Sequence, residues 1–177
     1  MLPVLQRRLD RLDLIRGRFL GAVTSASGPQ REFHPSAGAW SMLEVTEHLV
    51  LAEEKSVLGM QKAVPPSPRV SPVAHFRMAM VRLVLRSNIR VRVPTSRVLP
   101  TGSVALEELA ARWLEARRRL ESLLATITEA DVGRARFLHP IGGWVSAAEG
   151  VGFLAGHIAH HERQLRRVRR SPGFPAA

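Results

Sequence analysis

The stretch SAAEGVGFLAGHIAHHERQLRRVRR, residues 146–170, decides the fold. Ser146 and Glu149 stand at the spacing of a capping box, in which each side chain accepts a hydrogen bond from the other residue's backbone N–H in the first turn of a helix. Apolar residues then recur at helical intervals. The stretch ends in basic residues that suit the C-terminal end of a helix dipole: Arg166, Arg167, Arg169 and Arg170. We therefore expect one long helix that ends near Arg170.

Two histidines lie on one face of this expected helix. His157 and His161 are four positions apart, so their imidazoles project from the same side and can reach one metal ion. Gln164 follows on that face and is a candidate for orienting a ligand imidazole. His160 points about 100° away and is expected to be exposed or to lie behind the ligands. Histidine pairs at this spacing also arise by chance, so the pair alone leaves a structural role open.

A third histidine lies on a second, separately capped helix. In WSMLEVTEHL, residues 40–49, Ser41 and Glu44 form another capping box. His48 follows on the same helix. Helices that face each other in a bundle commonly build metal sites from inward side chains, so we expect His48 to join the histidine pair.

The expected site would bind a metal through nitrogen. The chain has no cysteine, which excludes disulfides, thiolate ligands and a cysteine nucleophile. Three imidazoles with open positions suit zinc, nickel or copper better than magnesium. We therefore expect a divalent cation, zinc or nickel first, at His48, His157 and His161.

Other polar residues are candidates for the surroundings of this site. Glu53 and Glu54 follow His48 on its helix, and either could act as a base near the metal. His139 lies shortly before the last expected helix and could line the mouth of a pocket. We treat these residues, with Gln164 and His160, as candidates for a layer behind the ligands or for the substrate pocket.

Helical periodicity extends over most of the chain. We expect further helices from Leu5 to Val23, from about Ser71 to Ile89 and from about Ser103 to Leu124. The helix of His48 should end near Val64, before Pro65. The helix at residues 71–89 is inferred from an apolar series: Val73, Phe76, Met80, Leu83 and Val84.

The remaining segments are interpreted as loops. These segments cover residues 29–40, 91–103 and 128–143, and the sequence contains no convincing strand. The sum predicts an all-α fold, an up-down four-helix bundle with an additional helix and long loops.

Length and composition set the domain organisation. With 177 residues one core can bury most of the apolar surface, so we expect a single domain over residues 1–170 and a loose tail over residues 171–177. The N-terminal stretch is amphipathic and carries acidic residues, unlike a signal peptide. The longest weakly polar stretch, residues 145–160, is too short to cross a bilayer. We expect a cytoplasmic protein with no membrane partner.

The net charge of +11 raises the alternative of nucleic-acid binding. Because the arginines are spread over several expected helices and the chain has no tyrosine, a platform for stacking bases is not indicated. The sequence therefore disfavours nucleic acid as a partner. Binding to DNA that falls steeply with salt would reverse this interpretation.

Three motifs together resemble the DinB/YfiT-like superfamily. They are W-S-x-x-E-V-x-E-H-L at residues 40–49, H-P-x-x-G from His139 and H-x-x-x-H-x-x-Q from His157 to Gln164. The resemblance implies a four-helix bundle in which three histidines hold a divalent metal. Matched to this chain, those ligands are His48, His157 and His161. Many members are dimers, so a homodimer is expected.

The resemblance also suggests a reaction class. Characterised members of the superfamily include transferases and isomerases that use small thiols such as bacillithiol or mycothiol, and in these the metal activates the thiol. We therefore expect a metal-dependent thiol S-transferase that acts on a small electrophile. Two alternatives stay open: a metal-dependent hydrolase, which needs a carboxylate near the metal, and a non-catalytic stress-related binding protein. Fold alone does not decide among them.

Overall fold

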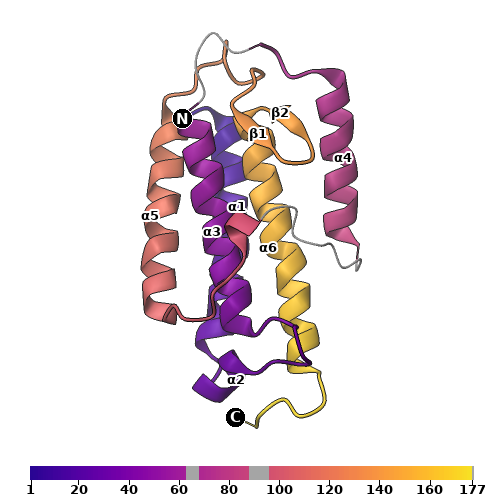
Figure 1. The fold of residues 1–177 in the computed structure, drawn as a ribbon. Coiled ribbons are helices and arrows are strands. Elements are labelled where there is room, and N and C mark those ends of the chain that lie inside the picture. Colours follow the sequence, from indigo (N-terminus) through magenta and orange to yellow (C-terminus); the bar gives the residue numbers. More distant parts are fainter. Residues whose placement is uncertain (63–67, 88–95, 177) are drawn as a thin grey trace.

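Four long helices lie side by side and form a bundle (Figure 1). They are α1 (Pro3–Thr24), α3 (Met42–Gln61), α5 (Leu106–Ala125) and α6 (Ala147–Arg169). The structure is a computed structural model, and it describes residues 1–62, 68–87 and 96–176. Helix α1 contacts α6, α6 contacts α3, and α3 contacts α5, which in turn contacts α1. The predicted all-α bundle is thus confirmed.

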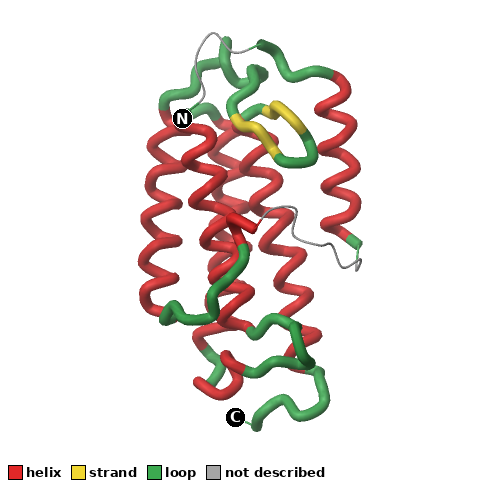
Figure 2. Tube along the Cα trace, in the orientation of Figure 1, coloured by secondary structure: helices red, strands yellow, loops and turns green. Residues whose placement is uncertain are grey.

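Helix directions alternate along the chain once α4 (Pro72–Arg86) is included (Figure 1). Helix α4 stands at the outer edge of the molecule, beside α6, and corresponds to the expected additional helix (Figure 2). Because α4 lies outside the bundle, α3 and α5 run in the same direction within it. This arrangement places the middle of α3 opposite the middle of α6.

Both predicted capping boxes are formed. The backbone N–H of Ser41 donates to Glu44 Oε2 at 2.7 Å, and that of Glu44 donates to Ser41 Oγ at 3.2 Å. Ser146 and Glu149 make the same exchange at 3.1 and 3.3 Å. These contacts fix where α3 and α6 begin, and therefore at what height their histidines stand.

The predicted apolar series of the first helix forms one side of the core. All of its members are buried: Leu5, Leu9, Leu12, Ile15, Phe19 and Val23. Phe19 meets Trp113 of α5 edge to face, with ring centroids 5.8 Å apart. Burying such rings stabilises the bundle by roughly 2–3 kcal/mol each.

A short helix and a short hairpin occur in or beside segments that the sequence predicts to be loops. Helix α2 (Gly28–Glu32) begins one residue before the segment 29–40 and covers its first four residues. Strands β1 (Phe137–His139) and β2 (Gly143–Val145) form an antiparallel hairpin in which Leu138 pairs with Trp144. The expectation of no strand was therefore wrong. Elements of five and three residues contain fewer than two periods of an apolar pattern, too few for periodicity to reveal them.

Some predicted boundaries differ from the structure. Helix α5 begins at Leu106, after an N-cap at Ala105 without a side-chain cap, and not near Ser103. In the expected linker 91–103, residues Ser96–Val98 form a 3-10 turn, η1. The predicted helix ends at Val64 and Ile89, and the linker residues 91–95, lie outside the described residues.

The apolar series that predicted α4 faces outward. Of its five members Val84 is half-buried and four are exposed: Val73, Phe76, Met80 and Leu83. The buried residues of α4 are Ala74, Met78 and Val81. The helix was predicted correctly, but the side assigned to the core was wrong. Two apolar series of helical spacing coexist in α4, and spacing does not tell which one is packed.

The C-terminal tail contacts α2. Phe174 lies edge to face against Phe33, with ring centroids 5.5 Å apart, and Gln30 Nε2 donates to the carbonyl of Pro175 at 3.0 Å. The expected loose tail thus has specific partners within the described residues. In the described part of the chain, none of the helices has the length and apolar character needed to span a membrane.

Candidate metal centre

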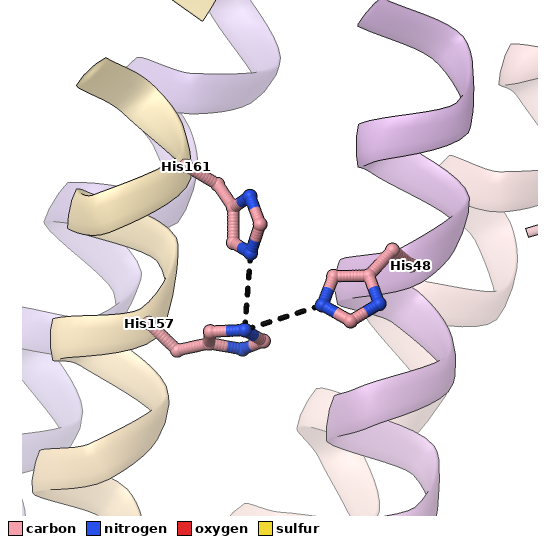
Figure 3. A group of neighbouring side chains, drawn as sticks. All are labelled: His48, His157 and His161. Carbon is pink, nitrogen blue, oxygen red and sulfur yellow. Dashed lines mark hydrogen bonds between the residues drawn. The ribbon is translucent and has the colours of Figure 1, made fainter. Parts of the chain in front are cut away.

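Three histidine side chains converge between α3 and α6 (Figure 3). His48 projects from α3, and His157 and His161 project from successive turns of α6. The Nε2 atom of His157 lies 3.2 Å from Nε2 of His48 and 3.1 Å from Nε2 of His161. One ring nitrogen from each residue lies within 4.8 Å of the others, so the structure brings the three predicted ligands together.

Two of these rings are held by their far nitrogen. Nδ1 of His48 lies 2.7 Å from the carbonyl oxygen of Val98 in η1. Because a carbonyl only accepts, this Nδ1 carries the proton and donates. Nδ1 of His161 similarly donates to Oε1 of Gln164 at 2.7 Å. A neutral imidazole with its proton on Nδ1 has a lone pair on Nε2, and both lone pairs face His157.

Burial keeps the three rings neutral. Loss of solvent lowers the pKa of His48, and it lowers the pKa of His161 to about 3. His157 has a pKa well below its ordinary value because it is desolvated and faces the other histidines. Neutral imidazole is the form that binds metals, so the cluster is ready to act as a ligand at neutral pH.

The number of protons available on the facing ring nitrogens is consistent with a bound cation. His157 Nε2 has a single position for a proton and could donate to only one of its two neighbours. At least one of the contacts of 3.1 and 3.2 Å would then join two lone pairs. A divalent cation at about 2.0–2.1 Å from each nitrogen removes this conflict, and a tetrahedral arrangement would separate the nitrogens by about 3.3 Å. The residues present therefore fit a three-histidine metal site.

Aromatic rings enclose the cluster. The Trp40 ring centroid lies 4.9 Å from that of His48, and Phe153 stacks on His157 at 5.3 Å. His139 meets Phe153 edge to face at 4.4 Å. The surroundings of the three ligand rings are thus largely apolar, which strengthens electrostatic interactions at the centre.

The centre lies in the part of the chain that defines its family. The family model described as the DinB superfamily matches residues 11–165, which include all three histidines. The chain belongs to the DinB superfamily. No curated protein and no solved structure matches the chain significantly.

Neither acidic candidate faces the histidines in this DinB-superfamily chain. Glu53 is buried beside α5, where Trp113 Nε1 donates to its Oε2 at 2.6 Å. Glu54 forms a paired contact with Arg112, whose Nε and Nη2 donate at 3.0 and 2.8 Å. The hypothesis that either carboxylate acts as a base at the metal is therefore wrong. At 100° per residue Glu53 lies about 140° and Glu54 about 120° around α3 from His48. The sequence positions alone already imply these angles.

The two remaining candidates support other parts of the fold. His160 is buried, and its Nδ1 lies 3.2 Å from the carbonyl oxygen of Leu85, so it contacts the end of α4 rather than solvent. His139 is buried in the hairpin, where its Nδ1 accepts from the backbone N–H groups of Gly142 and Ile141 at 2.9 and 3.2 Å. His139 contacts Phe153, which in turn stacks on His157.

Two contributors to the centre were missed. Phe153 precedes His157 by four positions, so helical spacing alone would have placed it on the ligand face. The carbonyl of Val98 belongs to the backbone, which carries no sequence signature. Its position depends on how η1 folds back on α3, and the two elements are in contact.

A surface depression of about 440 Å³ lies between the C-terminal halves of α3 and α5, lined in part by Gln61, Arg118 and Thr126. Gln61 follows His48 by thirteen residues, or about 20 Å along the helix. This depression is therefore separate from the histidine cluster.

Proposed function

We propose that this DinB-superfamily protein holds a divalent cation, zinc or nickel first, at His48, His157 and His161 and uses it in thiol S-transfer. The observation that carries the proposal is the convergence of three neutral imidazoles, two of which have their outer nitrogens tied to Val98 and Gln164. Fixed outer nitrogens orient ligand imidazoles in metal sites.

When bound, the cation would act as a Lewis acid and lower the pKa of a small thiol, so that the thiolate would be present at neutral pH. The three histidines leave coordination positions free for such a ligand, as in catalytic zinc sites. Trp40 and Phe153 present apolar ring surface against which the carbon skeleton of an electrophile can pack. In the proposed reaction the thiolate sulfur forms a bond to the electrophilic carbon, and the leaving group departs with the electron pair.

Metal content tests the first half of the proposal. Tag-free wild-type protein should contain nearly stoichiometric zinc or nickel by elemental analysis, and His48→Ala should lose it. His34→Ala is the matched control, because His34 is an exposed histidine outside the cluster. Metal added at a hundred times its Kd should raise the free energy of unfolding by about 2.7 kcal/mol in the wild type only.

A conjugation assay tests the second half. Metal-loaded wild-type protein should accelerate transfer of a small thiol to a model electrophile, followed by mass spectrometry. His157→Ala should abolish the acceleration, and His34→Ala should retain it. Absence of metal binding by the wild type contradicts the whole proposal. Stoichiometric metal without acceleration for any small thiol contradicts only the transferase.

The two alternatives differ in what they need. Hydrolysis needs a carboxylate near the cation, and Glu53 and Glu54, the carboxylates considered for that role, are bonded to Trp113 and Arg112. A non-catalytic binding protein would bind no metal, or would bind it without turnover. We further propose a homodimer, as is common in the superfamily, which light scattering after size exclusion tests directly.

A further inference from the structure

Helix α4 carries an apolar face that points away from the bundle. Val73, Phe76, Met80 and Leu83 are all exposed, and at 100° per residue they lie within an arc of about 80° around the helix. The buried residues of α4 lie on the opposite side. The helix is therefore apolar on two sides, and the core uses only one of them.

Positive charge borders this outer face. Arg77 and Arg86 are exposed and lie about 40° and 60° outside the two edges of the apolar arc. No acidic residue occurs in the sequence between Glu54 and Glu107, a stretch that contains nine lysines and arginines. The carboxylate of Glu149 contacts α4 by a hydrogen bond of 2.7 Å to His75, which lies outside the apolar arc, beyond Arg86.

The hairpin beside α4 adds exposed aromatic surface. Strand β2 contacts α4, and Leu138 pairs across the hairpin with Trp144; both side chains are exposed. Helix α4 itself stands at the edge of the molecule (Figure 1). A convex helix at an edge, next to an exposed tryptophan, can approach a flat surface.

We propose that α4 docks the protein on the surface of a lipid bilayer with anionic headgroups. An apolar face bordered by arginines is the pattern of helices that lie in the membrane interface. The apolar face would enter the boundary of the acyl chains, and Arg77 and Arg86 would contact the headgroups. The proposal concerns a bilayer surface and no spanning segment, and it differs from the sequence-based expectation of no membrane partner.

Other occupants fit this face less well. Helix α4 has 15 residues, so its outer face measures about 22 Å by about 10 Å, far below the roughly 800 Å² per partner of a stable protein interface. A second copy would also bring arginines against arginines. Nucleic acid would use the arginines but would leave the four apolar side chains in water.

Vesicle co-sedimentation of the full-length protein tests the proposal. The protein should bind vesicles of phosphatidylcholine mixed with phosphatidylserine, and not vesicles of phosphatidylcholine alone. Phe76→Ser with Leu83→Ser should weaken binding at least about tenfold. Arg77→Gln with Arg86→Gln should weaken it about thirtyfold. Leu14→Ser on α1 is the matched control, because Leu14 is 64% exposed and Phe76 is 67% exposed, and it should bind as the wild type does.

Several outcomes would overturn the proposal. The first is no binding to the mixed vesicles by the wild type. The second is that the Phe76 and Leu83 double variant binds the mixed vesicles as well as the wild type does, and that duplex DNA displaces the protein from these vesicles. This result would assign the face to nucleic acid. The third is a dimer that this variant converts to a monomer while vesicles are ignored, which would assign the face to a second copy. Circular dichroism and metal content should match the wild type in every variant, because all four substituted residues of α4 are exposed.

Discussion

Nδ1 of His161 donates to Oε1 of Gln164 across 2.7 Å, less than one turn along α6. This contact fixes which nitrogen of His161 faces the other two histidines. The neighbouring ligand His48 is fixed in the same way, but by the backbone carbonyl of Val98. A side-chain acceptor can be removed by substitution, so Gln164 is the position at which ring orientation can be tested.

Replacing Gln164 by alanine should weaken metal binding without removing a ligand. Outer partners of metal-bound histidines typically contribute about 10- to 100-fold in affinity, and we expect a loss of that size. Competition titration with a chromophoric chelator measures it. Gln61→Ala, at an exposed glutamine at the end of α3, should leave the affinity unchanged. Equal affinities for the two variants would show that Gln164 does not orient the ligand.

Acid should destabilise the hairpin through His139. Burial lowers the pKa of His139 from 6.5 to about 4, so the unfolded chain takes up a proton at a higher pH than the folded one. Its contribution is present above pH 6.5 and is lost as the pH falls toward 4, at about 1.4 kcal/mol per pH unit. The added proton would occupy Nδ1, where two backbone N–H groups already donate.

His139→Asn removes the titrating group and retains an oxygen that can accept. As the pH falls from 6.5 to 4, the wild type should therefore lose more free energy of unfolding than the variant does. Urea unfolding at several pH values measures this difference. A difference that is constant with pH contradicts this account.

A rise in pH from 4.5 to about 7 should destabilise the protein through Glu53. Burial raises its pKa from 4.5 to about 7, so the folded protein retains a proton that the unfolded chain has already lost. Its contribution is complete below pH 4.5 and is lost as the pH rises to about 7, again at about 1.4 kcal/mol per pH unit. Glu53→Gln keeps an acceptor for Trp113 but does not titrate. Its free energy of unfolding should therefore rise relative to that of the wild type over this pH range. Parallel curves of stability against pH would disprove the shift.

Arg163 should hold the end of α4 on the bundle. Its Nη2 donates to the carbonyl of Leu85 and, at 3.4 Å, to that of Ser87, and a cation suits this C-terminal end of a helix. Arg163→Ala should cost about 1–3 kcal/mol and speed hydrogen exchange in α4. Arg166→Ala, which removes only an exposed ion pair with Glu162 at 3.9 Å, is the control and should change stability by less than about 1 kcal/mol. Similar exchange rates in both variants would exclude a role for Arg163 in holding α4.

The sequence predicted those features that depend on local spacing. Capping boxes at Ser41 and Ser146 and the four-residue interval from His157 to His161 determine helix starts and shared faces, and the structure contains all of them. The third member, His48, followed from the packing of capped helices in a bundle.

Features that depend on which face is packed were not predictable in this way. In α4 the exposed Phe76 and the buried Met78 belong to two equally regular apolar series. Which one enters the core depends on the hairpin, where Gly142 lies so close to Met78 that a side chain there would collide with it. The positions of Glu53 and Glu54 could have been excluded from helical angles, but their partners Trp113 and Arg112 depend on how α3 and α5 align.

Two ligand nitrogens of the centre, Nε2 of His48 and Nε2 of His157, lie 3.2 Å apart but belong to residues 109 positions apart in the chain. During synthesis His48 is therefore exposed long before α6 exists, and a cation met at that stage could gain only one protein ligand. The complete set forms when the last helix packs against α3, which makes metal uptake a late event in folding. A bound cation would then report that α3 and α6 have packed together, and it would slow their separation.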